Sequence, residues 1–210
     1  MPRKHFSTDR FGALSDGIFA IAMTLLVLEL KMPDLGNTPF KEVFIAVAPK
    51  VEGWIFSFFV IGALWVLHHN VLSLIKRTTT AFLWMNLFFL MLISFMPWPT
   101  WLIGSYRNNP LALTLFSGTL GCAGLIVLAL WIYAAKDSRL TAEGVNLKNM
   151  PLNTWLIIRI PIVAILSIII AFIDPQYALM VWLLHAILGY GVRKYFVKAG
   201  KVKPEVADAI

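Results

Sequence analysis

Six apolar segments, each close to the length of a membrane-spanning helix, dominate this sequence. They cover residues 10–32, 48–75, 80–104, 111–135, 154–173 and 176–196. About 20 apolar residues in a helix cross the hydrocarbon core of a bilayer. In lipid, every backbone polar group has to be hydrogen-bonded inside the protein, which helices achieve on their own. We therefore expect a single all-α integral membrane domain over residues 1–210, with six transmembrane helices.

Composition and charge support this class and indicate an orientation. The chain is 59% hydrophobic and 14% charged, which excludes an ordinary soluble domain. Of its 18 basic residues, thirteen flank the predicted inner ends of the segments and four the outer ends, while Arg159 lies inside the fifth segment. Positive residues favour the cytoplasmic side. The sequence thus predicts cytoplasmic N- and C-termini, a multi-pass protein of the cell (plasma) membrane, contact with membrane lipids and no nucleic-acid partner.

Prolines and glycines mark the predicted connections. Residues 33–47 form the longest predicted outer connection, and Pro97-Trp98-Pro99-Thr100 is expected to stop the third segment sharply at the outer face. Pro161 is expected to kink the fifth segment.

Polar residues of the first three segments fall at one predicted depth near the inner face. A charge inside a membrane helix costs at least about 2.5–3.5 kcal/mol, so it usually has a task. Asp16 lies about 9 Å from the start of the first segment at 1.5 Å per residue. We hypothesise a polar network that fixes the inner end of the first helix, made of Arg10, Ser15, Asp16, His68, His69 and Asn86.

Other interpretations of the histidine pair stay open. His68 and His69 are also compatible with ordinary packing in which the ring nitrogens find partners. A metal site is weakly supported, because neighbouring histidines on a helix point about 100° apart and no cysteine or carboxylate cluster completes a ligand shell. No nucleophile motif accompanies Ser15 and Asp16, so we expect neither an enzyme nor a cofactor.

One face of the first segment has the spacing of a pore lining. Steps of three and four residues place Gly17, Ile21, Thr24, Leu25, Leu28 and Met32 together. A helix–helix seam would show the same spacing, but this face is continuous with the polar end at Ser15 and Asp16. Glu29, near the predicted outer mouth, would either concentrate cations or serve at the interface as a partner of Lys31 or a backbone cap.

The first segment, RFGALSDGIFAIAMTLLVLEL (residues 10–30), resembles the signature first helix of the transmembrane protein 175 family of potassium channels. In the family pattern R-x-x-x-F-S-D, Arg10, Ser15 and Asp16 match, whereas Leu14 replaces the phenylalanine. The resemblance continues through WVLHHN (65–70) and LWMNLFFLMLISFMPWPT (83–100) and thus covers the first three segments.

The resemblance implies a homotetramer of six-span subunits in which four first helices line a central pore. By position, Ile21, Leu25 and Leu28 would form apolar rings, Thr24 a hydroxyl layer, and the conserved polar residues a tie between helices. The family lacks the TVGYG filter of other potassium channels, as does this chain. The permeant ion would be K⁺, with other monovalent cations as further candidates, and selectivity for K⁺ over Na⁺ would be moderate.

The sequence leaves a competing function open. Asp16 and the histidines would also suit a proton- or cation-coupled secondary transporter. Such transporters often contain repeats and broken helices at the membrane midplane. We find no repeat and expect no break of the helix inside the first or fourth segment, which favours the channel.

Overall fold

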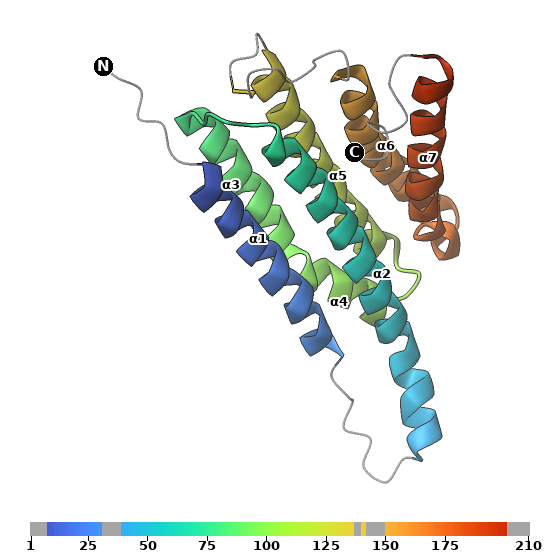
Figure 1. The fold of residues 1–210 in the computed structure, drawn as a ribbon. Coiled ribbons are helices and arrows are strands. Elements are labelled where there is room, and N and C mark those ends of the chain that lie inside the picture. Colours follow the sequence, from blue (N-terminus) through green and yellow to red (C-terminus); the bar gives the residue numbers. More distant parts are fainter. Residues whose placement is uncertain (1–7, 31–38, 137–139, 142–149, 201–210) are drawn as a thin grey trace.

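The computed structural model describes residues 8–30, 39–136, 140–141 and 150–200. Its elements are α1 (Thr8–Leu25), η1 (Leu26–Glu29), α2 (Phe40–Ser73), α3 (Thr80–Phe95), α4 (Pro97–Ser105), α5 (Pro110–Ala135), α6 (Met150–Ile173), η4 (Pro175–Tyr177), η5 (Met180–Trp182) and α7 (Leu183–Lys198). Figure 1 shows long helices running side by side as a bundle. No strand occurs in these ranges, so the predicted all-α class is confirmed.

The described residues contain five helical stretches that are long and apolar enough to cross a bilayer. They are Arg10–Glu29, Phe40–Ser73, Thr80–Ser105, Pro110–Ala135 and Thr154–Ile173. The sixth predicted segment, 176–196, is divided: the 3₁₀ turns η4 and η5 come first, and α7 then runs over 16 residues. The chain is a multi-pass membrane protein by the length and composition of these helices.

The second helix is longer than the predicted segment. It begins at Phe40, directly after Pro39, so residues 40–47 are helical and do not belong to a connection as predicted. At 1.5 Å per residue its 34 residues span about 51 Å, more than the roughly 30 Å of hydrocarbon. Its first turns protrude beyond the rest of the bundle (Figure 1).

The predicted sharp stop at residues 97–100 is wrong. The chain bends at Met96 and continues as α4, which leaves the line of α3 (Figure 1). Proline is well tolerated in the first turn of a helix, where its missing N–H has no partner to lose. The N–H of Thr100 still donates to the carbonyl of Met96 at 3.1 Å. The two prolines therefore turn the segment.

The core centres on α5 and its contact with α6. Small residues let these two helices approach closely, as is common in membranes. A Cβ built on Gly121 would lie 2.8 Å from the Cβ of Ala164. One built on Gly124 would lie 2.6 Å from Cγ2 of Ile160. Both contacts are too short, so only glycine fits at these two positions without movement.

The two ends of the described chain lie at the same end of the bundle. The start of α1 and the last turn of α7 are both in the upper part of Figure 1. This arrangement agrees with an even number of crossings. The assignment of that end to the cytoplasm rests on the distribution of basic residues in the sequence.

Candidate functional site

The first helix has one face buried in the subunit and one face open. Phe19 and Ala22 are each 1% exposed and Leu26 is fully buried. These side chains follow the helical period, and they pack against α2 and α3. The period of 3.6 residues then places the remaining side chains on the opposite side.

The open face contains the residues predicted to line a pore. Ile21 and Leu28 are each 59% exposed, Leu25 is 40% exposed, and Gly17 and Thr24 are also exposed. Leu28 lies in η1, where the last turn tightens to 3₁₀ geometry. Met32 lies outside the described residues. Since the subunit itself does not cover this face, either lipid or other copies of the chain must contact it in a membrane.

The exposed threonine presents an oxygen on this face. The hydroxyl of Thr24 donates to the carbonyl of Ile21 at 2.9 Å. With its proton committed to its own helix, the Thr24 oxygen keeps lone pairs that can accept from water or coordinate a cation.

Ser15, Asn86 and His68 form a buried hydrogen-bond chain across α1, α3 and α2. The side-chain amide of Asn86 donates to Oγ of Ser15 at 3.2 Å, and Ser15 donates to the carbonyl of Phe11 at 3.1 Å. Nε2 of His68 lies 2.6 Å from Oδ1 of Asn86. Because that oxygen can only accept, Nε2 must carry the proton. All three side chains are at most 1% exposed.

An aromatic ring holds the imidazole of this chain in place. Phe89 of α3 stacks on His68 with ring centroids 4.6 Å apart and an interplanar angle of 22°. On another side, Phe19 of α1 lies 5.9 Å from the same imidazole. The buried triad is thus enclosed by apolar side chains, where an unmade hydrogen bond is costly.

Asp16 and His69 belong to a separate, exposed group. Nε1 of Trp65 donates to Oδ1 of Asp16 at 2.8 Å, and the Trp65 ring lies 5.6 Å from that of His69. Ser15 and Asp16 are adjacent on α1, so their side chains point about 100° apart and do not share one site. The same holds for the two histidines on α2.

The hypothesised six-residue network therefore divides in two. Arg10 is exposed and joins neither group among the described residues. Sequence reasoning missed Trp65 and Phe89 as partners. The signal was available for Trp65, which lies one helical turn before His69 and on the same face.

Glu29 lies against its own subunit. It is half-buried and shares a hollow with Lys50 and Trp54 of α2 and with Thr100 and Gly104 of α4. Its neighbours Leu28 and Val27 are the more exposed residues of this turn.

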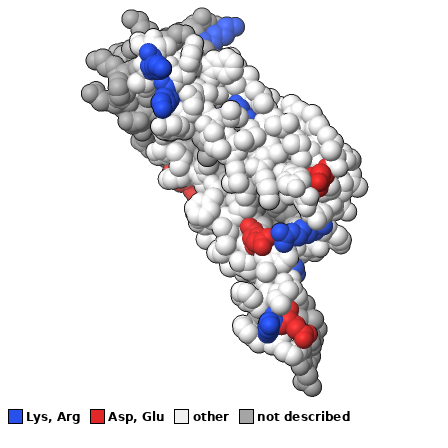
Figure 2. Space-filling view, turned by 90° about the vertical axis from the view of Figure 1, so that its right-hand side faces the viewer, with Lys and Arg blue, Asp and Glu red and all other residues white. Residues whose placement is uncertain are grey.

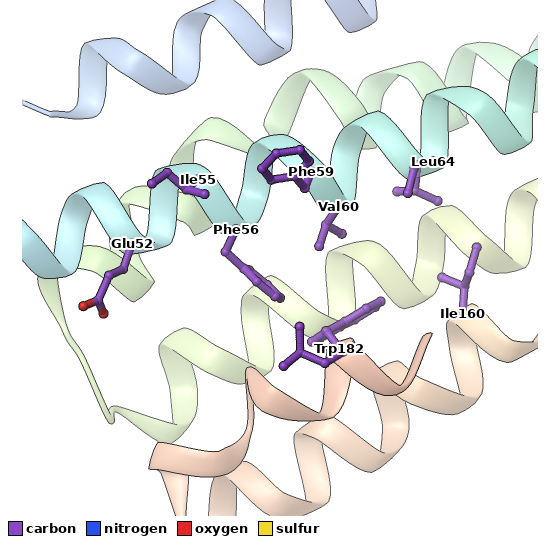
Figure 3. A pocket seen from close by; sticks show the side chains of 10 residues that line it. Glu52, Ile55, Phe56, Phe59, Val60, Leu64, Ile160 and Trp182 are labelled. Atoms are coloured by element: carbon purple, nitrogen blue, oxygen red, sulfur yellow. The ribbon is translucent and has the colours of Figure 1, made fainter. Parts of the chain in front are cut away.

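Two further features limit the chemistry of the molecule. In the part of the chain that the structure describes, no group of three or more His, Cys, Asp or Glu side chains is arranged to hold a metal ion. A cavity of about 540 Å³ lies between α2 and the region of η5 and α6 (Figure 3). Phe56, Phe59, Val60 and Trp182 line it, so it suits an apolar occupant.

These observations define the class of protein, an all-α multi-pass membrane subunit with one exposed helix face. The family model described as the endosomal/lysosomal potassium channel TMEM175 matches residues 10–97. A potassium channel of Chamaesiphon minutus is 37% identical over 142 residues, which is 65% of this chain and 70% of that protein. The chain belongs to the TMEM175 family, which confirms the resemblance drawn from residues 10–30, 65–70 and 83–100.

A solved structure extends the similarity beyond the first three segments. The crystal structure described as a lysosomal potassium-selective channel TMEM175 homolog from Chamaesiphon minutus matches with a TM-score of 0.77 at 29% identity. The match covers 88% of this chain and 97% of that one. The zebrafish (Danio rerio) endosomal/lysosomal proton channel TMEM175 is 24% identical over 177 residues, which are 81% of this chain and 34% of that protein.

Proposed function

We propose that this chain is the subunit of a K⁺-permeable cation channel whose pore is lined by α1. The observation that carries the proposal is the open face of α1, on which Gly17, Ile21, Thr24 and Leu28 lie exposed while the opposite face is buried. Assembly of several α1 helices around an axis would cover this face. The names of the bacterial relatives, which are potassium channels, support K⁺ as the ion.

The number of subunits in the proposal is four. The resemblance to the family supports a homotetramer, since relatives of this length are expected to place four first helices around one axis. The permeant ions would be K⁺ and, less favourably, other monovalent cations. We place the channel in the plasma membrane and assign it no enzymatic activity, no cofactor and no TVGYG-type filter.

In this assembly, Ile21, Leu25 and Leu28 form an apolar constriction. Rings of branched aliphatic side chains can close a narrow pore by excluding water, without any charge. Successive rings at steps of three and four residues lie about 4.5–6 Å apart along the helix. The constriction would then be short, so that a small widening hydrates it.

Thr24 supplies the polar layer between these rings. Its lone pairs on the open face would replace part of the water shell of a passing cation. Because K⁺ holds its water less tightly than Na⁺, a narrow and weakly polar layer favours K⁺ moderately. Glu29 would raise the local cation concentration near the outer end of the pore. It would do so from its place beside Lys50, because its side chain does not lie on the open face.

The buried triad of Ser15, Asn86 and His68 fixes the position of the pore helix. Ser15 precedes Ile21 by six residues, about 9 Å along α1. Hydrogen bonds through Asn86 and His68 fix this end of α1 to α3 and α2. The rotation of α1, and with it the side chains that face the axis, follows from this attachment.

A second candidate, a proton- or cation-coupled transporter, is favoured by one specific observation. Asp16 and His69 are titratable groups on the exposed side of the same region, joined through Trp65. Animal relatives are named proton channels. The two functions differ in their electrical signature, because a channel passes current down a gradient without saturable coupling.

The test is the reversal potential of the reconstituted protein under a K⁺/Na⁺ gradient. We compare wild type with Ile21→Asn and, as a matched control, with Ile165→Asn on α6, whose side chain has the same 59% exposure. The wild-type reversal should shift toward the K⁺ equilibrium value. Ile21→Asn should relax it and raise conductance, whereas Ile165→Asn should not.

A second assay asks whether water reaches the face. Cys122 is the chain's single cysteine, so a Cys122→Ala background accepts Ile21→Cys or Ile165→Cys as the sole thiol. A charged, membrane-impermeant thiol reagent should modify position 21 and reduce the current, and leave position 165 unmodified. Modification of 165 alone, or coupled uptake without current, would contradict the channel.

A further inference from the structure

Arg159 of α6 and Arg193 of α7 have buried donors without an acceptor in the described part of the chain. These donors are Nε and Nη1 of Arg159 and Nε of Arg193. A guanidinium keeps its charge at neutral pH and presents its N–H groups in a rigid fork. Leaving charged donors unpaired in a poorly hydrated site is unfavourable.

A glycine on α7 makes room for the first guanidinium. Gly189 is buried, and a Cβ built on it would collide with Nη1 of Arg159. Gly189 lies four residues before Arg193, so both share one face of α7. The Arg159 guanidinium therefore rests on the backbone of α7, one helical turn from Arg193.

The directions of the helices bring the two charges together. Side chains lean toward the N-terminus of their own helix, and α6 and α7 run in opposite directions (Figure 1). Arg159 thus leans toward the predicted cytoplasmic end and Arg193 leans away from it. Their like charges repel each other, and an anion bound between them would reduce this repulsion.

The surroundings indicate where such an anion comes from. Arg159 follows Met150 by nine residues, about 13 Å along α6, and it is only half-buried. Trp155, one turn before it, and Ile162, just after it, are exposed on α6. In Figure 2 the upper end of the visible face shows Lys and Arg without Asp or Glu among the coloured residues.

Within the described residues, the structure shows no ion pair between a carboxylate and Arg159 or Arg193. Among the described residues, the ion pair of the structure joins Arg107 to Glu52 at 2.8 Å, and these two lie in the loop after α4 and on α2. The loop between α6 and α7 contributes Asp174 at the opposite end of α6. Neither carboxylate is placed to pair with Arg159 or Arg193.

We propose that Arg159 and Arg193 form a binding site for a phosphate group, carried by the headgroup of an anionic phospholipid in the leaflet at this end of the bundle. Phosphate oxygens accept paired N–H bonds from guanidinium groups. Basic pockets between transmembrane helices bind such headgroups. The exposed apolar side chains beside the site, Trp155 and Ile162, accommodate the acyl chains, which a free phosphate ion does not need.

The experiment counts lipids bound to the full-length protein in detergent by native mass spectrometry. Phosphatidylglycerol, phosphatidylcholine and inorganic phosphate are titrated separately. The variants are Arg193→Gln and Gly189→Ala, with Gly191→Ala as the matched control because nothing lies within 4 Å of a Cβ there. Both glycine changes raise helix propensity alike, so only the displacement of Arg159 distinguishes them.

Wild type and Gly191→Ala should bind phosphatidylglycerol in preference to phosphatidylcholine. Arg193→Gln and Gly189→Ala should bind it about tenfold more weakly or worse, the loss expected for a charge-assisted hydrogen bond. Equal binding by all four proteins would overturn the site. Displacement of the lipid by inorganic phosphate at matched concentration would overturn the lipid as the source. Arg159→Gln is an additional variant, and neither conclusion depends on its folding.

Discussion

Replacement of Asn86 by leucine should destabilise the subunit through its hydrogen bonds and not through its volume. Asn86 is fully buried and bonds to Ser15 at 3.2 Å and to His68 at 2.6 Å. Leucine has a similar size, so the change leaves little cavity. The change deprives the N–H of His68 of its acceptor. The Ser15 hydroxyl loses the bond that it accepts from Asn86 but keeps the bond that it donates to the carbonyl of Phe11.

The magnitude follows from which partner is left unsatisfied. An orphaned buried donor costs about 1–3 kcal/mol, which applies to His68. The Ser15 hydroxyl keeps its own donated bond, and interhelical hydrogen bonds in membranes average about 0.6 kcal/mol. We expect Asn86→Leu to lower the free energy of unfolding by about 2 kcal/mol.

A second substitution separates the hydrogen bond from packing. In Asn86→Leu/His68→Phe both partners become apolar, and phenylalanine can keep the stack on Phe89. Replacing both partners of a buried bond is often nearly neutral. The double variant should therefore recover most of the loss, with a coupling energy of about 1–2 kcal/mol in a double-mutant cycle.

The assay is reversible unfolding of the purified protein in mixed micelles, followed by circular dichroism. Each variant is measured beside Ser94→Ala, a control on α3 whose exposed hydroxyl bonds only to its own helix at Met91. Two results would contradict a role of the triad in fixing α1. One is that the losses of unfolding free energy in the cycle are additive. The other is that Asn86→Leu loses no more unfolding free energy than Ser94→Ala.

Three other outcomes are expected. Thr24→Val should lower the K⁺/Na⁺ permeability ratio without changing assembly. An unchanged reversal potential would show that the Thr24 hydroxyl does not contribute to selectivity. Gly124→Ala should destabilise the protein by about 1–2 kcal/mol, because overpacking against Ile160 costs about 1–3 kcal/mol and the helix regains up to about 1 kcal/mol. Gly118→Ala, with open space around it, should be neutral or stabilising in the same unfolding assay in mixed micelles. Asp16→Ala should leave the subunit folded, since its bond is exposed, but impair assembly or current; oligomers and currents equal to wild type would show that Asp16 has no such role.

Much of the fold is predictable from hydropathy because lipid leaves the backbone few alternatives. The spans at 111–135 and 154–173 end within a few residues of α5 and α6. Errors occur where a local signal has two structural outcomes. Pro97 and Pro99 predict a stop, yet proline at the start of a helix also permits a turn into α4. Residues 40–47 resemble a connection only because prolines precede them.

The candidate site was only partly predictable for a related reason. Sequence depth along three segments places Ser15, His68 and Asn86 in one layer, and the structure joins them. Depth alone gives no rotation about the helix axis, so it does not separate Asp16 and His69 from this network. Their separation, and the role of Trp65, depend on which way each helix is turned.

The sequence by itself determines that this chain is a helical membrane protein of the TMEM175 family, because hydrophobic length and the order of Arg10, Ser15 and Asp16 need no tertiary information. The tertiary structure decides which side of α1 is buried, since Phe19 and Leu26 fill the space against α2 and α3 and leave Ile21 and Thr24 open. It also decides that Arg159 rests on Gly189, because a contact between residues on separate helices depends on how those helices pack.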